Sequence, residues 1–88
     1  MAVRKGSLRI VDRILQDHRV EVNSIDNRGR TALWWTASEG NCAMVLRLLA
    51  DRRIQVDIED NARESPLIVA RRWGHAKVEL QLQRHMGL

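Results

Sequence analysis

The strongest constraint on the fold is a repeat of 34 residues along the chain. Gly6, Gly40 and Gly74 mark this interval. Further pairs match in register: Val22 with Val56, Asn23 with Asp57, Asp26 with Asp60, Asn27 with Asn61, Thr31 with Ser65 and Leu33 with Leu67. Agreement in chemical type over this many positions indicates stacked supersecondary units, each of which contacts only its neighbours.

The repeat also resolves a difficulty that the composition raises. A chain of 88 residues builds only a marginal single core, and its one cysteine, Cys42, cannot form an intramolecular disulfide. A stack of units needs no large central core. Phe and Tyr are absent, and Trp34, Trp35 and Trp73 are the only aromatic residues, so we expect an aliphatic core.

Each unit is predicted to begin with a short inner helix. Thr31 and Ser65 are suited to cap a helix, because their hydroxyls can accept hydrogen bonds from unpaired backbone N–H groups. Pro66 follows at the first helical position, where its missing N–H costs nothing. Gly40 and Gly74 suit the left-handed conformation that ends a helix.

An outer helix and an extended segment complete the unit. Asn41, and less ideally His75, begin the outer helix. In the middle unit its apolar residues, within 42–49, are numerous enough to pack on two sides. Apolar and polar residues then alternate at 54–56, and the turn-forming sequence Asp-Asn-Arg-Gly occupies 26–29.

Residues 31–40, Thr-Ala-Leu-Trp-Trp-Thr-Ala-Ser-Glu-Gly, carry a specific resemblance together with Val-Leu-Arg-Leu-Leu at 45–49. They resemble the Thr-Pro-Leu-His-x-Ala-Ala core and the Val-Val-x-Leu-Leu outer helix of an ankyrin repeat. Ser-Pro-Leu-Ile-Val-Ala at 65–70, with Gly-His at 74–75, resembles the motif again. Membership of the ankyrin-repeat family implies an all-α solenoid of stacked helix-turn-helix units with extended turn fingers.

Two departures from the family pattern affect the expected structure. The family's histidine, which ties the inner helix to its own threonine, is replaced by Trp34 and Ile68, so capping rests on the hydroxyl alone. Gly29 of the first finger is matched by Arg63 in the second. A residue with a side chain is strained in the left-handed region, and we therefore expect a different turn in the second finger.

The resemblance divides residues 1–88 as a single domain. The expected parts are a partial N-terminal repeat at 1–25, a full repeat at 26–59 and a C-terminal capping repeat at 60–88. In the last repeat Glu79 and Gln83 take the places of Val45 and Leu49. A polar outer face is what a terminal repeat needs, so we expect no further repeat to follow.

The N-terminal end is expected to leave an apolar face uncovered. Leu8, Val11 and Leu15 lack an upstream inner helix in this sequence. Either the chain is the C-terminal part of a longer array, or another protomer covers this face through self-association.

No catalytic or metal-binding pattern is found in the sequence. Cys42 aligns in register with apolar positions, which favours packing over nucleophilic chemistry. His18, His75 and His85 lack metal-ligand spacing, and no Ser-His-Asp set, carboxylate pair or phosphate-binding glycine loop is present. We therefore expect no enzyme, no cofactor and no metal.

Charge and hydropathy restrict the remaining classes. The net charge of +4 is distributed as +3 over 1–30, −2 over 31–64 and +3 over 65–88. Acidic residues separate the arginines and no aromatic ladder accompanies them, so a mixed-charge surface is favoured over nucleic-acid binding. No apolar run is long enough to span a membrane. The single thiol and the absence of a signal-peptide pattern favour an intracellular location, cytoplasmic or nuclear.

Protein binding is the function that the resemblance implies. In the family the turn tips and the exposed side of the inner helices form a concave surface that holds partner proteins. By register, the residues expected on this surface are Asn27, Arg28, Arg30, Ser38, Glu39, Asn61, Arg72 and Trp73. We expect Trp73 to be exposed, since its counterparts Lys5 and Glu39 are charged, and the arginines to favour an acidic partner. The alternative is a structural segment that caps a longer array or docks it on a neighbouring domain.

Overall fold

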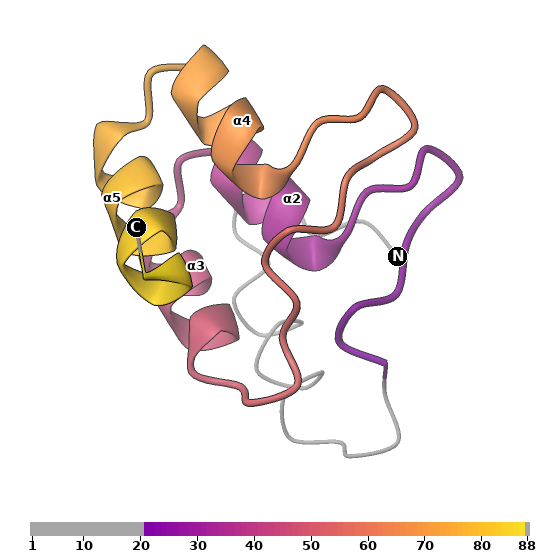
Figure 1. Cartoon of the computed structure of the whole chain (residues 1–88), viewed down its shortest axis with the longest axis horizontal. Helices are drawn as coiled ribbons and strands as arrows, with labels where there is room; N and C mark the ends of the chain where they lie inside the picture. The colour runs from indigo at the N-terminus through magenta and orange to yellow at the C-terminus, as the bar shows by residue number, and fades with distance from the viewer. Residues whose placement is uncertain (1–20, 88) are drawn as a thin grey trace.

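The computed structural model describes residues 21–87 of the chain. This part contains four helices, α2 (Ala32–Ser38), α3 (Cys42–Leu49), α4 (Pro66–Arg72) and α5 (Ala76–Met86), and no strand (Figure 1). The all-α prediction is confirmed. The apolar face expected at Leu8, Val11 and Leu15 of the partial repeat lies outside the described residues.

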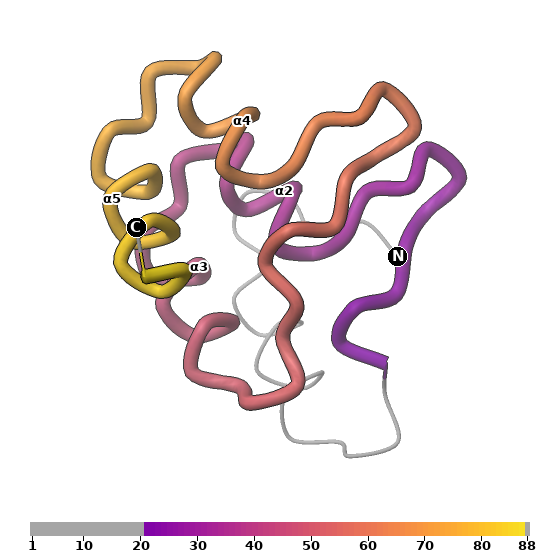
Figure 2. Tube along the Cα trace, in the orientation of Figure 1, coloured from indigo at the N-terminus to yellow at the C-terminus, as the bar shows by residue number. Residues whose placement is uncertain are grey.

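The helices form two layers of two. α2 and α4 lie side by side as the inner layer, and α3 and α5 form the outer layer, which packs against one side of them (Figure 1). The segments before α2 and α4 project from the inner layer as two neighbouring loops (Figure 2). We call residues 26–30 the first finger and residues 60–64 the second finger. The predicted stack of helix-turn-helix units with turn fingers is therefore confirmed.

The inner helices begin where the sequence predicts. Thr31 Oγ1 accepts a hydrogen bond from the backbone N–H of Trp34 at 3.1 Å, and Ser65 Oγ accepts one from Ile68 at 3.3 Å. Pro66 occupies the first turn of α4. Hydroxyl caps of this kind typically stabilise a helix by about 1 kcal/mol, which matters for helices of only two turns.

The outer helices begin differently from each other. Asn41 Oδ1 caps α3 by accepting from the N–H of Met44 at 3.2 Å, whereas the side chain of His75 makes no cap hydrogen bond to α5. The ring Nε2 of His75 instead lies 2.9 Å from the carbonyl oxygen of Ser38 in the preceding repeat. A Cβ on Gly40, at φ +69°, would stand only 2.5 Å from this ring. His75 therefore ties the two repeats together where Gly40 leaves room for it.

The core lies between the two layers and is aliphatic, as predicted. Its buried members come from all four helices: Ala32, Leu33, Ala37, Met44, Val45, Leu48, Ala70, Val78 and Leu82. Cys42 is partly buried and packs against this cluster, in agreement with the packing role expected for it. Burying one valine, leucine or methionine side chain contributes about 1.5–3 kcal/mol to stability.

The two fingers adopt the same turn, so the prediction of a different second turn was wrong. In each finger the carboxylate of the first residue, Asp26 or Asp60, accepts from the N–H groups two and four residues later at 2.8–2.9 Å. Arg63 takes φ +61° where Gly29 takes φ +77°. The strain of a left-handed arginine is about 1–2 kcal/mol, and these hydrogen bonds offset it.

Candidate functional site

The tips of the two fingers are joined by hydrogen bonds. The N–H of Asn61 donates to the carbonyl of Arg28 at 2.8 Å, and its side-chain Nδ2 donates to the carbonyl of Asn27 at 3.3 Å. A Cβ on Gly29 would stand 2.8 Å from Asn61 Oδ1, so the tips approach too closely for a larger residue there. All three of the predicted tip residues, Asn27, Arg28 and Asn61, are exposed. They form one continuous and internally braced surface.

Arg30 is placed differently from the tip residues. Its guanidinium lies 4.2 Å from the centre of the Trp34 ring and 5.0 Å from that of Trp35. The two indoles meet edge to face, with centroids 5.1 Å apart and planes at 75°. Arg30 Nε also lies 3.9 Å from the carboxylate of Asp60 in the second finger. The residue that the sequence places on the partner surface thus also stabilises the base of the first finger by cation–π contact.

The carboxylate of Asp26 accepts three hydrogen bonds that hold the first finger. Its Oδ1 accepts from the backbone N–H groups of Arg28 and Arg30, both at 2.9 Å, while Oδ2 accepts from Trp35 Nε1 at 3.0 Å. Burial alone would raise the pKa of this carboxyl. The hydrogen bonds and the nearby Arg30 charge outweigh burial and hold the pKa of Asp26 below its ordinary value. The finger is therefore held by an ionised aspartate.

Trp73 ends α4 with its side chain in solvent. Its exposed fraction is 63%, and the predicted exposure of this indole is confirmed. Arg72 precedes it, is also exposed, and pairs with Glu64 of the second finger. The counterpart at the end of α2, Glu39, is only half-exposed. The last repeat consequently presents a large aromatic side chain where the middle repeat presents a partly covered carboxylate.

The eight predicted residues fall into two groups separated by the length of the inner helices. One group lies in the fingers, before α2 and α4 begin, and the other lies where these helices end. A helix of seven residues rises about 10 Å. The first group comprises Asn27, Arg28, Arg30 and Asn61, and the second comprises Ser38, Glu39, Arg72 and Trp73. A partner that contacts both groups must therefore lie along the inner helices.

Two findings bear on other kinds of site. Among residues 21–87, no group of three or more His, Cys, Asp and Glu side chains is arranged to hold a metal ion. In the same part of the chain, no helix combines the length and the apolar character that crossing a bilayer requires.

The fold and the match to a family model identify the family of this chain. Helix-turn-helix units stacked in two layers, with turn fingers at one edge, define a helical repeat protein. The family model for ankyrin repeats (3 copies) matches residues 1–85, and the chain belongs to this family. No curated protein matches the chain. Ankyrin repeats generally serve as protein–protein interaction modules and are typically non-catalytic.

Sequence reasoning missed the bracing of the first finger. The recurrence of Asp26 as Asp60 is a usable signal for a shared turn, because an aspartate before a turn can accept from the N–H groups that follow. The packing of Arg30 on Trp34 and Trp35 has no such signal, since its counterpart in the second finger is Glu64. Only the fold shows that this arginine faces the indoles.

Proposed function

We propose that this chain is a non-catalytic protein-binding module that holds a partner protein across its concave face. This face comprises the finger tips and the exposed side of α2 and α4. The observation that carries the proposal is the 63% exposure of Trp73 beside Arg72. Exposed tryptophan and arginine side chains are the residues that most often dominate binding energy at protein interfaces.

The charges on this face favour an acidic partner. Arg28 and Arg72 are both exposed, and a guanidinium can hold a carboxylate through two parallel hydrogen bonds. Arg30 contributes differently, because its contact with the indoles fixes the shape of the first finger. Since the tips are already braced by Asn61, little conformational entropy is lost when a partner binds.

We propose the division of the chain given by the register, with a partial repeat at 1–25, a full repeat at 26–59 and a capping repeat at 60–88. The outer side of α5 supports the capping role. Glu79 there accepts from Arg71 at 3.1 Å and from Gln83 at 3.4 Å, so polar side chains satisfy one another at positions equivalent to Val45 and Leu49. The proposed encounter takes place in the cytoplasm or nucleus, since the unpaired thiol of Cys42 suits a reducing compartment.

Substitution of Trp73 by alanine tests the concave face. Proteins captured from an extract by the immobilised wild type are compared with those captured by Trp73→Ala and by Leu80→Ala. Leu80 is an exposed residue of α5 and serves as the control. We expect a specific partner to bind Trp73→Ala roughly thirtyfold more weakly, which corresponds to about 2 kcal/mol, and to bind Leu80→Ala normally. Unchanged affinity for Trp73→Ala with retained helicity would contradict the proposal.

The rival function is structural, in which the repeats cap or dock a longer array. Self-association through Leu8, Val11 and Leu15, outside the described residues, belongs to the same rival. It predicts a melting temperature that rises with protein concentration, whereas a protein-binding monomer melts independently of concentration. A steep dependence of oligonucleotide binding on salt would instead support the third function, nucleic-acid binding.

A further inference from the structure

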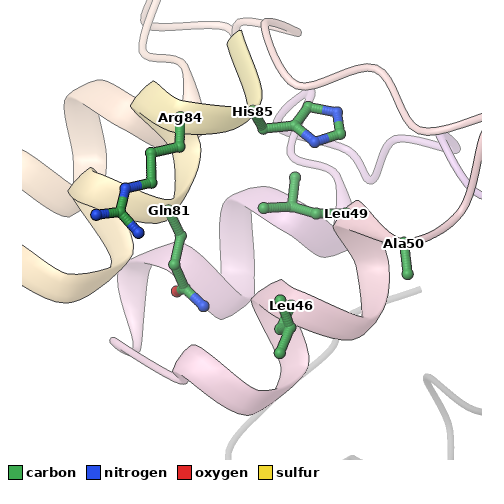
Figure 3. A pocket seen from close by; sticks show the side chains of 6 residues that line it. All are labelled: Leu46, Leu49, Ala50, Gln81, Arg84 and His85. Atoms are coloured by element: carbon green, nitrogen blue, oxygen red, sulfur yellow. The ribbon is translucent and has the colours of Figure 1, made fainter. Parts of the chain in front are cut away.

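A hollow lies between the two outer helices, in the layer behind the proposed concave face. It has a volume of about 470 Å³ and is mostly apolar. Figure 3 shows side chains of α5 on one side of it and side chains of α3 on the other. Its lining residues are Leu46, Leu49, Ala50, Gln81, Arg84 and His85. We call this hollow the outer groove, and its volume lies within the range of ordinary ligand-binding sites.

Leu46 is the feature of the groove that core packing leaves unexplained. Three other apolar residues of α3, Met44, Val45 and Leu48, are buried, whereas 62% of Leu46 is exposed. Leu49 lies one turn further along α3 and is only partly buried against the core. Together the exposed Leu46 and the partly buried Leu49 form an apolar surface with polar neighbours, which is the character of many interaction sites.

The walls of the groove are fixed before anything binds. Gln81 Nε2 donates to the carbonyl oxygen of Cys42 at 3.2 Å and so ties α5 to the first turn of α3. Beneath it, Val78 and Leu82 of α5 are buried with Leu48 of α3 in the common core. A preformed groove requires little ordering on binding.

The rim of the groove is basic. Arg84 and His85 line it, and no carboxylate does. Within residues 21–87, Arg84 takes part in no ion pair. The rim therefore complements carboxylates, while the floor complements apolar side chains.

We propose that the outer groove binds an acidic peptide segment of a partner protein, which inserts an apolar side chain against Leu46 and Leu49 and places a carboxylate beside Arg84. Nucleic acid fits this site less well, because the leucine floor offers no aromatic surface on which a base could stack. The groove is separate from the concave face, so this chain carries two docking surfaces on opposite layers.

The experiment selects peptides for the groove and then locates where they bind. A display library of 12-residue peptides is selected on Trp73→Ala, which lacks the proposed anchor of the concave face, and counter-selected on Leu46→Glu. The matched control is Leu80→Glu, because Leu80 is the 34-residue counterpart of Leu46, is 47% exposed and does not line the groove. Circular dichroism verifies that each variant is folded.

We expect the enriched peptides to combine Leu, Ile or Phe with Asp or Glu. Fluorescence anisotropy measures the affinity of each variant for the selected peptide. Leu46→Glu and Arg84→Glu should each lower this affinity by at least about tenfold, as expected for the loss of a central interface contact. The affinities of Leu80→Glu and of the wild-type protein for the peptide should lie within about twofold of the affinity of Trp73→Ala, since exposed residues outside an interface contribute little to binding. The selection is carried out on a variant that already lacks Trp73, so its outcome does not depend on the concave face. Failure of the groove proposal can therefore be distinguished from failure of the concave-face proposal.

Four outcomes would overturn the proposal. The first is a selection that enriches no acidic and apolar residues, and the second is an equal loss of peptide affinity in Leu46→Glu and Leu80→Glu. The third is preferential binding of a labelled oligonucleotide that Arg84→Glu abolishes. The fourth is a wild-type dimer in sedimentation that Leu46→Glu dissociates. The third would assign the rim to nucleic acid, and the fourth would assign the groove to a second copy of the chain.

Discussion

The proposed middle repeat (26–59) and the described part of the proposed capping repeat (60–88) both consist of a finger, an inner helix and an outer helix. Side chains at equivalent positions nevertheless make different contacts. The first finger is braced by indoles, with Arg30 packed on Trp34 and Trp35. In the second finger the counterpart of Arg30 is Glu64, which pairs with the exposed Arg72. The backbone hydrogen bonds of the two fingers are nevertheless the same.

The finger backbone and the exposed surface of each repeat are therefore specified by different residues in this chain. Asp26 and Asp60 fix the shared turn through identical hydrogen bonds. Other equivalent positions differ, with Glu64 in the place of Arg30 and Trp73 in the place of Glu39. The middle repeat therefore has an inward-facing cluster, whereas the last repeat has an exposed Trp73. Substitutions at equivalent positions of the two repeats therefore test how far the repeats are interchangeable.

Alanine at the two helix-ending glycines should break the equivalence most strongly. Both have positive φ, at +69° for Gly40 and +74° for Gly74, but only a Cβ on Gly40 meets a neighbour, the ring of His75. Gly74→Ala should cost about 1–2 kcal/mol of unfolding free energy for the left-handed strain. Gly40→Ala should cost roughly 2–4 kcal/mol, because displacing the ring also breaks its contact with Ser38. Urea unfolding measures both, and equal losses would mean that His75 moves aside without cost.

Glycine at Arg63 should make the second finger more like the first. Arg63 is the one residue other than glycine with positive φ among residues 21–87. Relief of its strain, partly offset by the greater freedom of glycine in the unfolded chain, should raise the unfolding free energy by about 0.5–1 kcal/mol. Ala62→Gly, one residue earlier in the same finger, is the matched control and should not stabilise the protein. A less stable Arg63→Gly in urea unfolding would show that the arginine side chain contributes more than its backbone strain costs.

Acid should weaken the first finger through Asp26. Because the pKa of Asp26 is lower in the folded state than the value of about 3.9 in an unfolded chain, its ionised form stabilises the fold above that value. This contribution is lost as the pH falls through the folded-state pKa. Asp26→Asn keeps a side-chain oxygen that can accept from the backbone N–H groups of Arg28 and Arg30 but cannot ionise. Its loss of unfolding free energy relative to wild type should therefore shrink below about pH 4. Urea unfolding at several pH values measures the trend, with Asp57→Asn as an exposed control, and a constant difference would contradict it.

The sequence predicts the framework of this fold well because caps and repeats are local properties. Thr31 and Ser65 cap their helices as their hydroxyls suggest, and register alone indicates that Trp73 is exposed. The turn at Arg63 was predicted wrongly because backbone preference was weighed without the hydrogen bonds to Asp60. Local preferences yield where several tertiary contacts act together.

The candidate sites could be predicted only in part, because they depend on how the repeats stack. The residues of the concave face follow from the register. The contact of His75 with Ser38 and the outer groove at Leu46 arise between repeats, and their geometry depends on the angle at which one repeat packs on the next. Periodicity within one sequence does not encode that angle.

The placement of the three indoles also determines how the molecule can be observed. Without Tyr or Phe, all near-ultraviolet absorption and fluorescence from aromatic side chains originates from Trp34, Trp35 and Trp73. The edge-to-face pair, 5.1 Å apart, should give a strong near-ultraviolet dichroism band and report on the middle repeat. The solvated Trp73 should emit at longer wavelength and be quenched readily by iodide. One unlabelled sample can therefore report separately on melting of the first finger and on events at the end of α4.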